Sequence, residues 1–152
     1  MKTKILTLFL TLGILVFTSC DNDDNSEFES TEMNFTEIGK GALYGSGQEG
    51  ISQSNVIISN TNDWQNLISQ MNSVNNVSDN FTETDINFNE FSVFAIFLEV
   101  KSSGWEIETE TVTENQNSIS ISTLETEYAT AVITQPFSII KIPKTNKSII
   151  VE

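Results

Sequence analysis

Two adjacent segments do most to limit the folds that this chain can adopt. Residues 93–98 are apolar at every position, which is typical of a strand that is buried on both faces. After a small-residue turn, Trp105, Ile107 and Thr109 alternate with glutamates over residues 105–110. A period of two predicts a strand with one buried side and one solvent-facing side. Together the segments predict a β-sheet whose central strand is covered on both faces.

One segment has a helical period instead. Its apolar residues recur at i, i+3, i+4 and i+7, namely Trp64, Leu67, Ile68 and Met71. This spacing predicts an amphipathic helix, with Asn62 and Gln65 as its capping box and its end near Asn72. We expect the apolar stripe to pack on the sheet; the alternative is a groove on a partner protein.

Shorter apolar or alternating runs predict the remaining strands, at residues 41–44, 55–59, 119–121, 131–134, 137–142 and 149–151. Pro136 has no N–H for a ladder, so we expect a break there, and the glycine-rich residues 45–50 should form a mobile loop. The pattern predicts one α+β domain over residues 35–152. It consists of a mainly antiparallel sheet of about six to eight strands with one amphipathic helix packed on it.

The N-terminal segment has the features of a lipoprotein signal peptide. Lys2 and Lys4 precede an apolar run over residues 5–17, which is too short to span a bilayer core of about 30 Å. Residues 17–20 resemble a lipobox, so residues 1–19 are the predicted signal peptide and Cys20 the lipidated residue that binds the membrane. The alternative is an ordinary signal peptide with a chance cysteine.

An acidic stretch follows, and residues 20–34 are predicted to be a tether. Asp21, Asp23 and Asp24 resemble the acidic export signals that follow the lipid cysteine in surface-displayed bacterial lipoproteins. We therefore expect an outer-membrane lipoprotein exposed at the cell surface. A periplasm-facing location is the alternative, because an aspartate directly after the cysteine is also a retention signal.

Composition excludes several classes of function. The chain has 21 acidic residues, seven lysines, no arginine and no histidine, giving a formal charge of −14. Nucleic-acid binding needs clustered cations, so no nucleic-acid partner is expected. Without histidine the commonest general base and metal ligand is missing, and the single cysteine cannot form a disulfide within the chain.

Two further patterns resemble sites but do not support them. The spacing of Gly45, Gly47 and Gly50 matches the dinucleotide-binding fingerprint. That motif must open a helix, however, and a strand is predicted to follow here. The glutamates of residues 105–110 are best interpreted as a solvated strand face, with hard-cation binding as the alternative. We expect no enzyme activity, no metal and no cofactor; a small hydrolase remains a distant alternative.

The second half of the chain resembles a known family. Residues 87–89, 93–97, 103–105 and 134–143 are similar to the PrcB C-terminal domain, in which an apolar strand runs into a glycine-aromatic turn and the domain closes with a Gln-Pro-aromatic strand. The likeness covers residues 88–152, with Ser103 where a second glycine is usual and Trp105 in place of a tyrosine. It implies a non-catalytic protein-binding module that stabilises or docks on a secreted or surface protease complex.

A second resemblance supplies the alternative function. Residues 102–105 and 135–137 are similar to two loops of chagasin-type cysteine-protease inhibitors, which are all-β sandwiches. Both resemblances point to one candidate binding loop, made of Lys101, Ser102, Ser103, Gly104, Trp105, Gln135, Pro136 and Phe137. Because Trp105 is in phase with Ile107, we expect it in the core; the alternative is an interface anchor.

Overall fold

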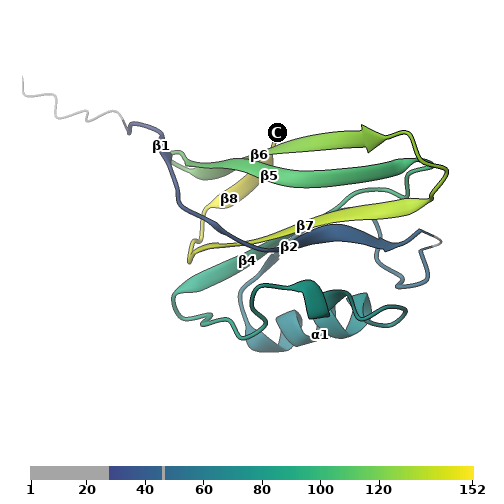
Figure 1. Ribbon diagram of the computed structural model, residues 1–152. Coiled ribbons are helices and arrows are strands. Elements are labelled where there is room, and N and C mark those ends of the chain that lie inside the picture. Colours follow the sequence, from purple (N-terminus) through teal and green to yellow (C-terminus); the bar gives the residue numbers. More distant parts are fainter. Residues whose placement is uncertain (1–27, 46) are drawn as a thin grey trace, which may run out of the picture.

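The apolar run of residues 93–98 forms strand β4 (Phe91–Phe97), which lies inside a four-stranded sheet. The computed structural model describes residues 28–45 and 47–152 and is mostly β-sheet with one α-helix (Figure 1). The predicted lipidation at Cys20 and the export signal at Asp21, Asp23 and Asp24 lie outside the described residues.

The first sheet holds the strands that flank β4. Its order is β2-β7-β4-β3, with β2 at Thr36–Tyr44, β3 at Ser54–Ile58 and β7 at Thr134–Pro143, and all neighbours are antiparallel. As expected, β4 is central and buried on both faces. Its alternate side chains divide between two apolar clusters, one on each face of the sheet.

The second sheet has the order β1-β5-β6-β8. Its strands are β1 (Thr31–Glu32), β5 (Gly104–Glu114), β6 (Ser118–Tyr128) and β8 (Ser148–Val151). The alternation over residues 105–110 is confirmed, with Ile107 and Thr109 buried and Glu106 and Glu110 exposed. A register shift between Thr109 and Thr111 then changes the phase, so that Val112 is the next buried residue. β8 runs parallel to β6.

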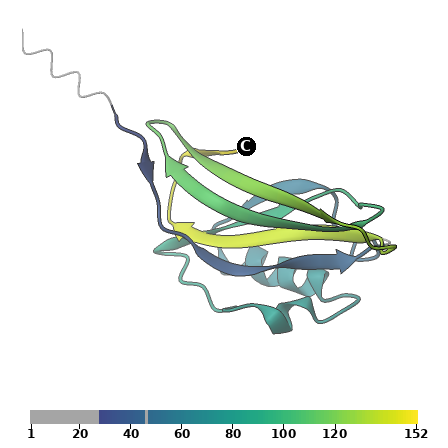
Figure 2. The same cartoon turned by 45° about the horizontal axis from the view of Figure 1, so that its top comes forward.

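The expectation of one sheet with about six to eight strands is therefore wrong. The eight strands divide into two facing sheets, which Figures 1 and 2 show as separate layers, with the helix on the outer side of the first sheet. Phe94, Ile96 and Ile140 of the first sheet pack against Ile107 and Ile121 of the second. Two sheets were not foreseen because alternation reports which side of a strand is buried but not which sheet buries it.

Helix α1 (Thr61–Met71) covers the other face of the first sheet. The expected stripe is confirmed, with Trp64, Ile68 and Met71 buried, and the helix ends at Met71 as expected. The cap lies two residues earlier than predicted, because Asn60 rather than Asn62 accepts from the Asp63 N–H at 2.9 Å. A short 3-10 helix, η1 (Val77–Asn80), follows where no structure was expected.

Strand β7 differs most from expectation, because it runs unbroken through Pro136. The Pro136 carbonyl accepts from Leu98 N–H at 3.0 Å. In a strand the N–H and C=O of one residue point the same way, so the missing donor lies opposite the Leu98 carbonyl. Gln135 Nε2 donates to that carbonyl at 3.1 Å and so replaces the absent N–H.

Two boundaries also differ from expectation. Residues 131–134 were predicted as strand, but only Thr134 belongs to one. Ordered structure begins before residue 35, because Thr31 and Glu32 pair with the end of β5 and Met33 packs against the core between the sheets. Among the described residues, no helix is both long and apolar enough to cross a membrane.

Candidate functional site

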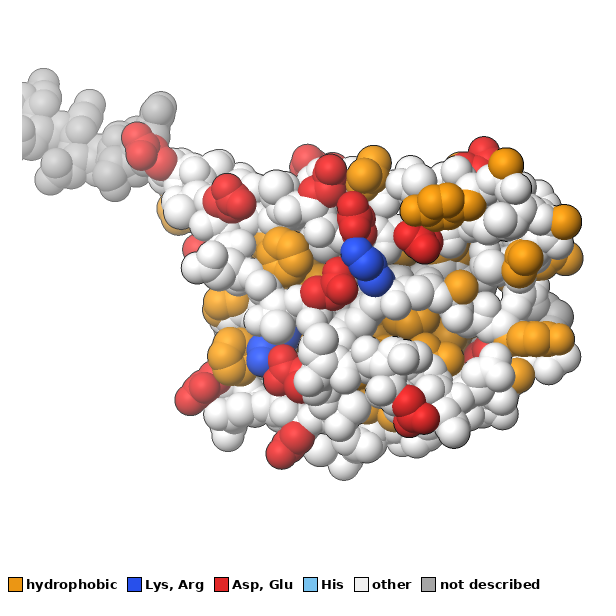
Figure 3. Space-filling view, in the orientation of Figure 1, with side chains coloured by type: hydrophobic (Ala, Val, Ile, Leu, Met, Phe, Trp, Pro, Cys, Tyr) orange, Lys and Arg blue, Asp and Glu red, His pale blue; other side chains and the backbone are white. Residues whose placement is uncertain are grey.

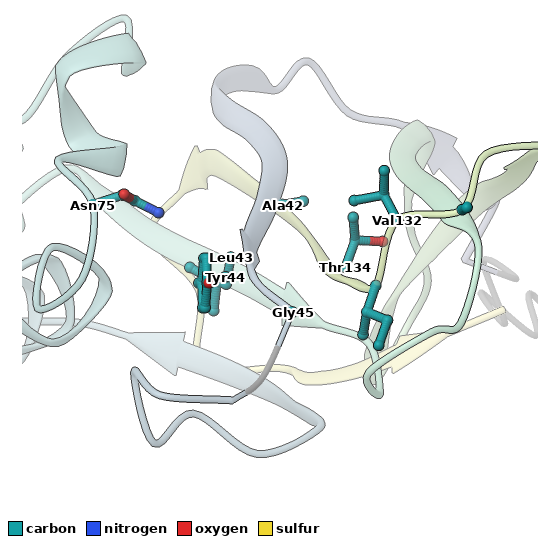
Figure 4. Close-up of a pocket in the computed structure, with 9 residues that line it drawn as sticks. Ala42, Leu43, Tyr44, Gly45, Asn75, Val132 and Thr134 are labelled. Carbon is teal, nitrogen blue, oxygen red and sulfur yellow. The ribbon is translucent and has the colours of Figure 1, made fainter.

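One end of the sandwich carries two adjoining grooves lined by exposed apolar side chains. The first, of about 500 Å³, lies between the end of β2 and the β6–β7 loop, and Figure 4 shows Ala42–Gly45 across from Val132 and Thr134. The second, of about 300 Å³, shares Ala42, Val132 and Thr134 and is also lined by Trp105 and Tyr128. We call this region the end surface and define it by Tyr44, Trp105, Tyr128, Val132 and Ile133.

The end surface is exposed to an extent unusual for apolar side chains. Tyr44, Tyr128, Val132 and Ile133 are 50%, 45%, 54% and 57% exposed. Figure 3 shows apolar side chains gathered at this end, where β6 leads into β7. Exposed aromatic and branched side chains grouped in this way are typical of protein-binding surfaces.

Two glycines hold the β6–β7 loop against the neighbouring strands. A Cβ at Gly45 would lie 1.8 Å from the Ile133 carbonyl oxygen, and a Cβ at Gly104 would lie 2.4 Å from Thr130 Oγ1. The Gly104 N–H donates to the same hydroxyl at 3.0 Å. Any larger residue at either position would push the loop away, so these glycines fix the shape of the end surface.

Residues 101–105 lie directly beside this loop. Lys101 and Thr134 exchange two backbone hydrogen bonds, of 2.8 and 3.1 Å. The Thr134 hydroxyl donates to the Ser103 carbonyl at 3.3 Å and accepts from Trp105 N–H at 3.4 Å. The structure thus brings Lys101, Ser103 and Trp105 together with the start of β7.

Trp105 is half-buried and belongs to neither apolar cluster, so the expectation of a core residue is wrong. Its phase with Ile107 is as predicted, but Trp105 is the second residue of β5 and lies at the end of the strand. The Lys101 ammonium lies 4.5 Å from the ring centroid and 3.3 Å from Glu125. A cation held over an aromatic ring in this way orients the indole, which lines the second groove.

The second part of the predicted binding loop does not reach the surface. Gln135, Pro136 and Phe137 are buried in β7, with Gln135 and Phe137 only 1% exposed. Gln135 Nε2 donates to Ile51 O and Leu98 O, and Phe137 packs beneath Gly41. These three residues support the end surface from below and cannot contact a partner directly.

Sequence reasoning missed Tyr44, Tyr128, Val132 and Ile133. The only signal was the run of residues 131–133, which is apolar without alternation and was interpreted as part of a strand over residues 131–134. Buried Glu49 holds the Tyr44 backbone, since its Oε1 accepts from Tyr44 N–H at 2.8 Å.

The strand-face glutamates make contacts with their own neighbours. Tyr128 donates its hydroxyl to Glu106 Oε2 at 3.1 Å, and Lys40 Nζ donates to Glu108 Oε2 at 2.7 Å. The hydrogen bond to Glu106, aided by its negative charge, raises the pKa of the Tyr128 phenol above the ordinary 10.0. The bond to Glu108 likewise raises the pKa of Lys40 above 10.5.

The end surface offers two grooves lined by apolar side chains and a few polar ones. Over residues 28–45 and 47–152, no three His, Cys, Asp or Glu side chains lie close enough together to hold a metal ion. The polar side chains of the two grooves are the hydroxyls of threonine and tyrosine, the Asn75 amide and the Glu106 carboxylate, which is paired with Tyr128. Comparisons of the chain with protein-family models, with curated proteins and with solved structures found no match.

Proposed function

We propose that this chain is a non-catalytic, membrane-tethered module that binds a partner protein through the end surface. The observation that carries the proposal is the grouping of four strongly exposed apolar side chains with half-buried Trp105 around two connected grooves. Tyrosine and tryptophan dominate protein-binding hot spots because they offer a large contact area at a low entropic cost.

The proposed location is the outer membrane, through lipidated Cys20, with display at the cell surface directed by Asp21, Asp23 and Asp24. The PrcB-like resemblance supports a secreted or surface protease complex as the partner, which this module would stabilise or dock on. The exposed apolar side chains of the end surface suit such docking, because their burial would supply affinity.

The experiment is affinity capture from native membranes with matched surface variants. Val132→Asp and Ile133→Asp each place a charge on the end surface and should abolish retrieval of the partner. Leu124→Asp is the control, because Leu124 is 44% exposed but lies on the outer face of β6. Equal retrieval by all variants, or no specific partner at all, would refute the proposal.

The anchor is tested separately. Cys20→Ala should release the protein from membranes while leaving the fold unchanged, and a variant that resists salt washing would contradict lipidation.

Replacing Asp21, Asp23 and Asp24 by Asn should reduce protease accessibility on intact cells; unchanged accessibility would favour the periplasm-facing location.

The second candidate function is a chagasin-like inhibitor of cysteine proteases. Two facing sheets are the arrangement that this resemblance implies, whereas α1 and the burial of Gln135–Phe137 weigh against it. An inhibition assay against a panel of cysteine proteases separates the two candidates. Tight inhibition of a cysteine protease would favour the inhibitor function over the docking function.

A further inference from the structure

Strand β3 leaves one edge of the first sheet open. It pairs only with β4, from Ser54↔Phe97 to Ile58↔Val93. Since Leu98 bonds toward β7 and successive residues point to opposite edges, Val56 bonds to β4 while Asn55 and Ile57 point outward. Among the described residues, no hydrogen bond to the backbone of Asn55 or Ile57 is found on that side.

This edge lacks the protection that the other edges have. β2 carries Glu37 and Lys40, β1 carries Glu32, and the four-residue β8 is bounded directly by Lys147 and Glu152. β3 has no charged residue and no proline, and its Val56 and Ile57 are 36% and 44% exposed. Exposed edge strands normally carry a charge, a proline or a bulge to prevent pairing with other chains, so β3 is suited to pairing.

A groove lies on each side of the open edge. On the helix side, about 330 Å³ are bounded by Val56, Leu67 and Phe97, with Asp63 among its lining residues. On the side of the second sheet, about 420 Å³ are bounded by Asn55, Thr123 and Glu125. A strand added beside β3 would direct alternate side chains into the two grooves.

We infer that the β3 edge accepts an extended segment of a partner protein, in which apolar residues alternate with lysine or arginine. The segment would add a fifth strand to the first sheet through the backbone groups of Asn55 and Ile57, a known mode of peptide recognition. Its apolar side chains fit the groove at Leu67, and its cations fit the groove at Glu125, where they would share with Lys101 the carboxylate that this lysine contacts at 3.3 Å.

Charge favours this occupant over a second copy of the chain. The protein carries a formal charge of −14, so two copies repel each other whereas a cationic segment is attracted. The inference concerns a different surface from the end surface and is independent of the function proposed above.

The test measures binding of a peptide of about six alternating lysine and valine residues to the full chain in mild detergent. Two control peptides carry N-methyl groups on alternate residues, one in each register. The form methylated on the pairing edge should bind at least about ten-fold more weakly, while the other form binds like the parent peptide. Equal binding by all three peptides would mean that charge alone attracts them and would overturn the proposal.

Amide hydrogen exchange of the unmodified protein gives a readout that does not depend on a variant. The Asn55 and Ile57 amides should exchange more slowly when the peptide is bound, and the Val56 amide should not change, because it already bonds to β4. Unchanged exchange at Asn55 and Ile57 under saturating peptide would refute strand addition.

Matched variants locate the site. Val56→Lys should weaken peptide binding at least about ten-fold, whereas Thr111→Lys adds the same charge at an exposed position of β5 and should leave it within about two-fold. Val132→Asp on the end surface should not reduce peptide binding either. A failure of the strand-addition inference can therefore be distinguished from a failure of the proposed function. If the protein forms a dimer that the peptide does not dissociate but Val56→Lys does, a second copy covers the edge. That outcome would overturn the proposal.

Discussion

Trp105 illustrates how a residue can have the predicted orientation and a different environment. It points to the inner side of β5 but is half-buried at the end of the sandwich. Trp105→Ala should therefore cost about 1–2 kcal/mol, less than the 3–5 kcal/mol or so of a fully buried aromatic. Denaturant unfolding checks this, with Phe94→Ala, which removes a 2% exposed core ring, as the comparison. Equal losses for the two variants would place Trp105 in the core.

Tyr128 should titrate late because its hydroxyl donates to Glu106. In a Tyr44→Phe background, where Tyr128 is the only tyrosine, phenolate absorbance should rise only above the ordinary pKa of 10.0. Glu106→Gln should move the midpoint back toward 10.0. Because the folded pKa is raised, this contact stabilises the protein fully below pH 10 and the stabilisation is lost as the pH rises through the folded pKa.

Gln135 and Pro136 should be energetically coupled. Gln135→Ala leaves the buried Leu98 carbonyl without a donor and should cost about 1–3 kcal/mol. In a Pro136→Ala background the restored N–H can donate to the Leu98 carbonyl. Gln135→Ala should then lower the free energy of unfolding by about 1 kcal/mol less than it does in the wild type. A double-mutant cycle by denaturant unfolding measures the difference. Strict additivity would mean that the Gln135 side chain does not replace the proline donor.

The burial of a single residue was predictable where it follows from the residues next to it in the sequence. The burial of Ile107 follows from alternation alone, and the helix stripe at Trp64 from its spacing. Val132 and Ile133 were missed because exposure depends on the loop packing against Gly45, which is distant in sequence. Pro136 was misjudged because its partner at Leu98 and the side-chain donor from Gln135 appear only in three dimensions.

At the scale of elements, helix α1 provides a direct test of its own start. Asn60→Ala removes the acceptor for the Asp63 N–H and should destabilise the domain by about 1 kcal/mol. Asn62→Ala, at the cap expected from the sequence, should change stability by less than about 0.5 kcal/mol because Asn62 is an exposed residue within the helix. Thermal melts compare the two; a larger loss for Asn62→Ala would contradict the observed cap.

The elements themselves were largely predictable, but their ends and partners were not. β3, β4, α1 and the start of β6 lie within a residue or two of expectation, because each has a clear local pattern of apolar residues. β1 has only two residues and no period, so nothing in residues 31–32 indicates that they pair with Glu114. The start of β7 was blurred because residues 131–133 are as apolar as a strand.

For the whole molecule, surplus negative charge should govern the response to salt. Every lysine in the described part of the chain contacts a carboxylate or a carbonyl, as Lys141 does with Glu83 and Lys144 with Phe88 O. Many carboxylates therefore repel one another without a compensating cation. The melting temperature should rise by a few degrees between low salt and about 0.15 M salt, as calorimetry can measure. A fall would mean that the ion pairs outweigh the repulsion.

The division into two sheets was beyond the reach of the sequence. Each strand predicts only its own buried side, and the α+β pattern is equally compatible with one large sheet. The face of the first sheet that packs on the second differs little in composition from the face under α1, because Ile and Phe line both. The resemblances could not decide the matter either, since each rests on short motifs.

The pairing of β2 with β7 has a consequence for how the chain acquires its structure. The first long strand finds its partner about a hundred residues later, at Thr36↔Lys141. Topologies that depend on such distant pairings fold slowly, because the intervening loop must close before any contact compensates for its entropy. During synthesis β2 therefore has no strand to pair with until residues 134–143 have been made.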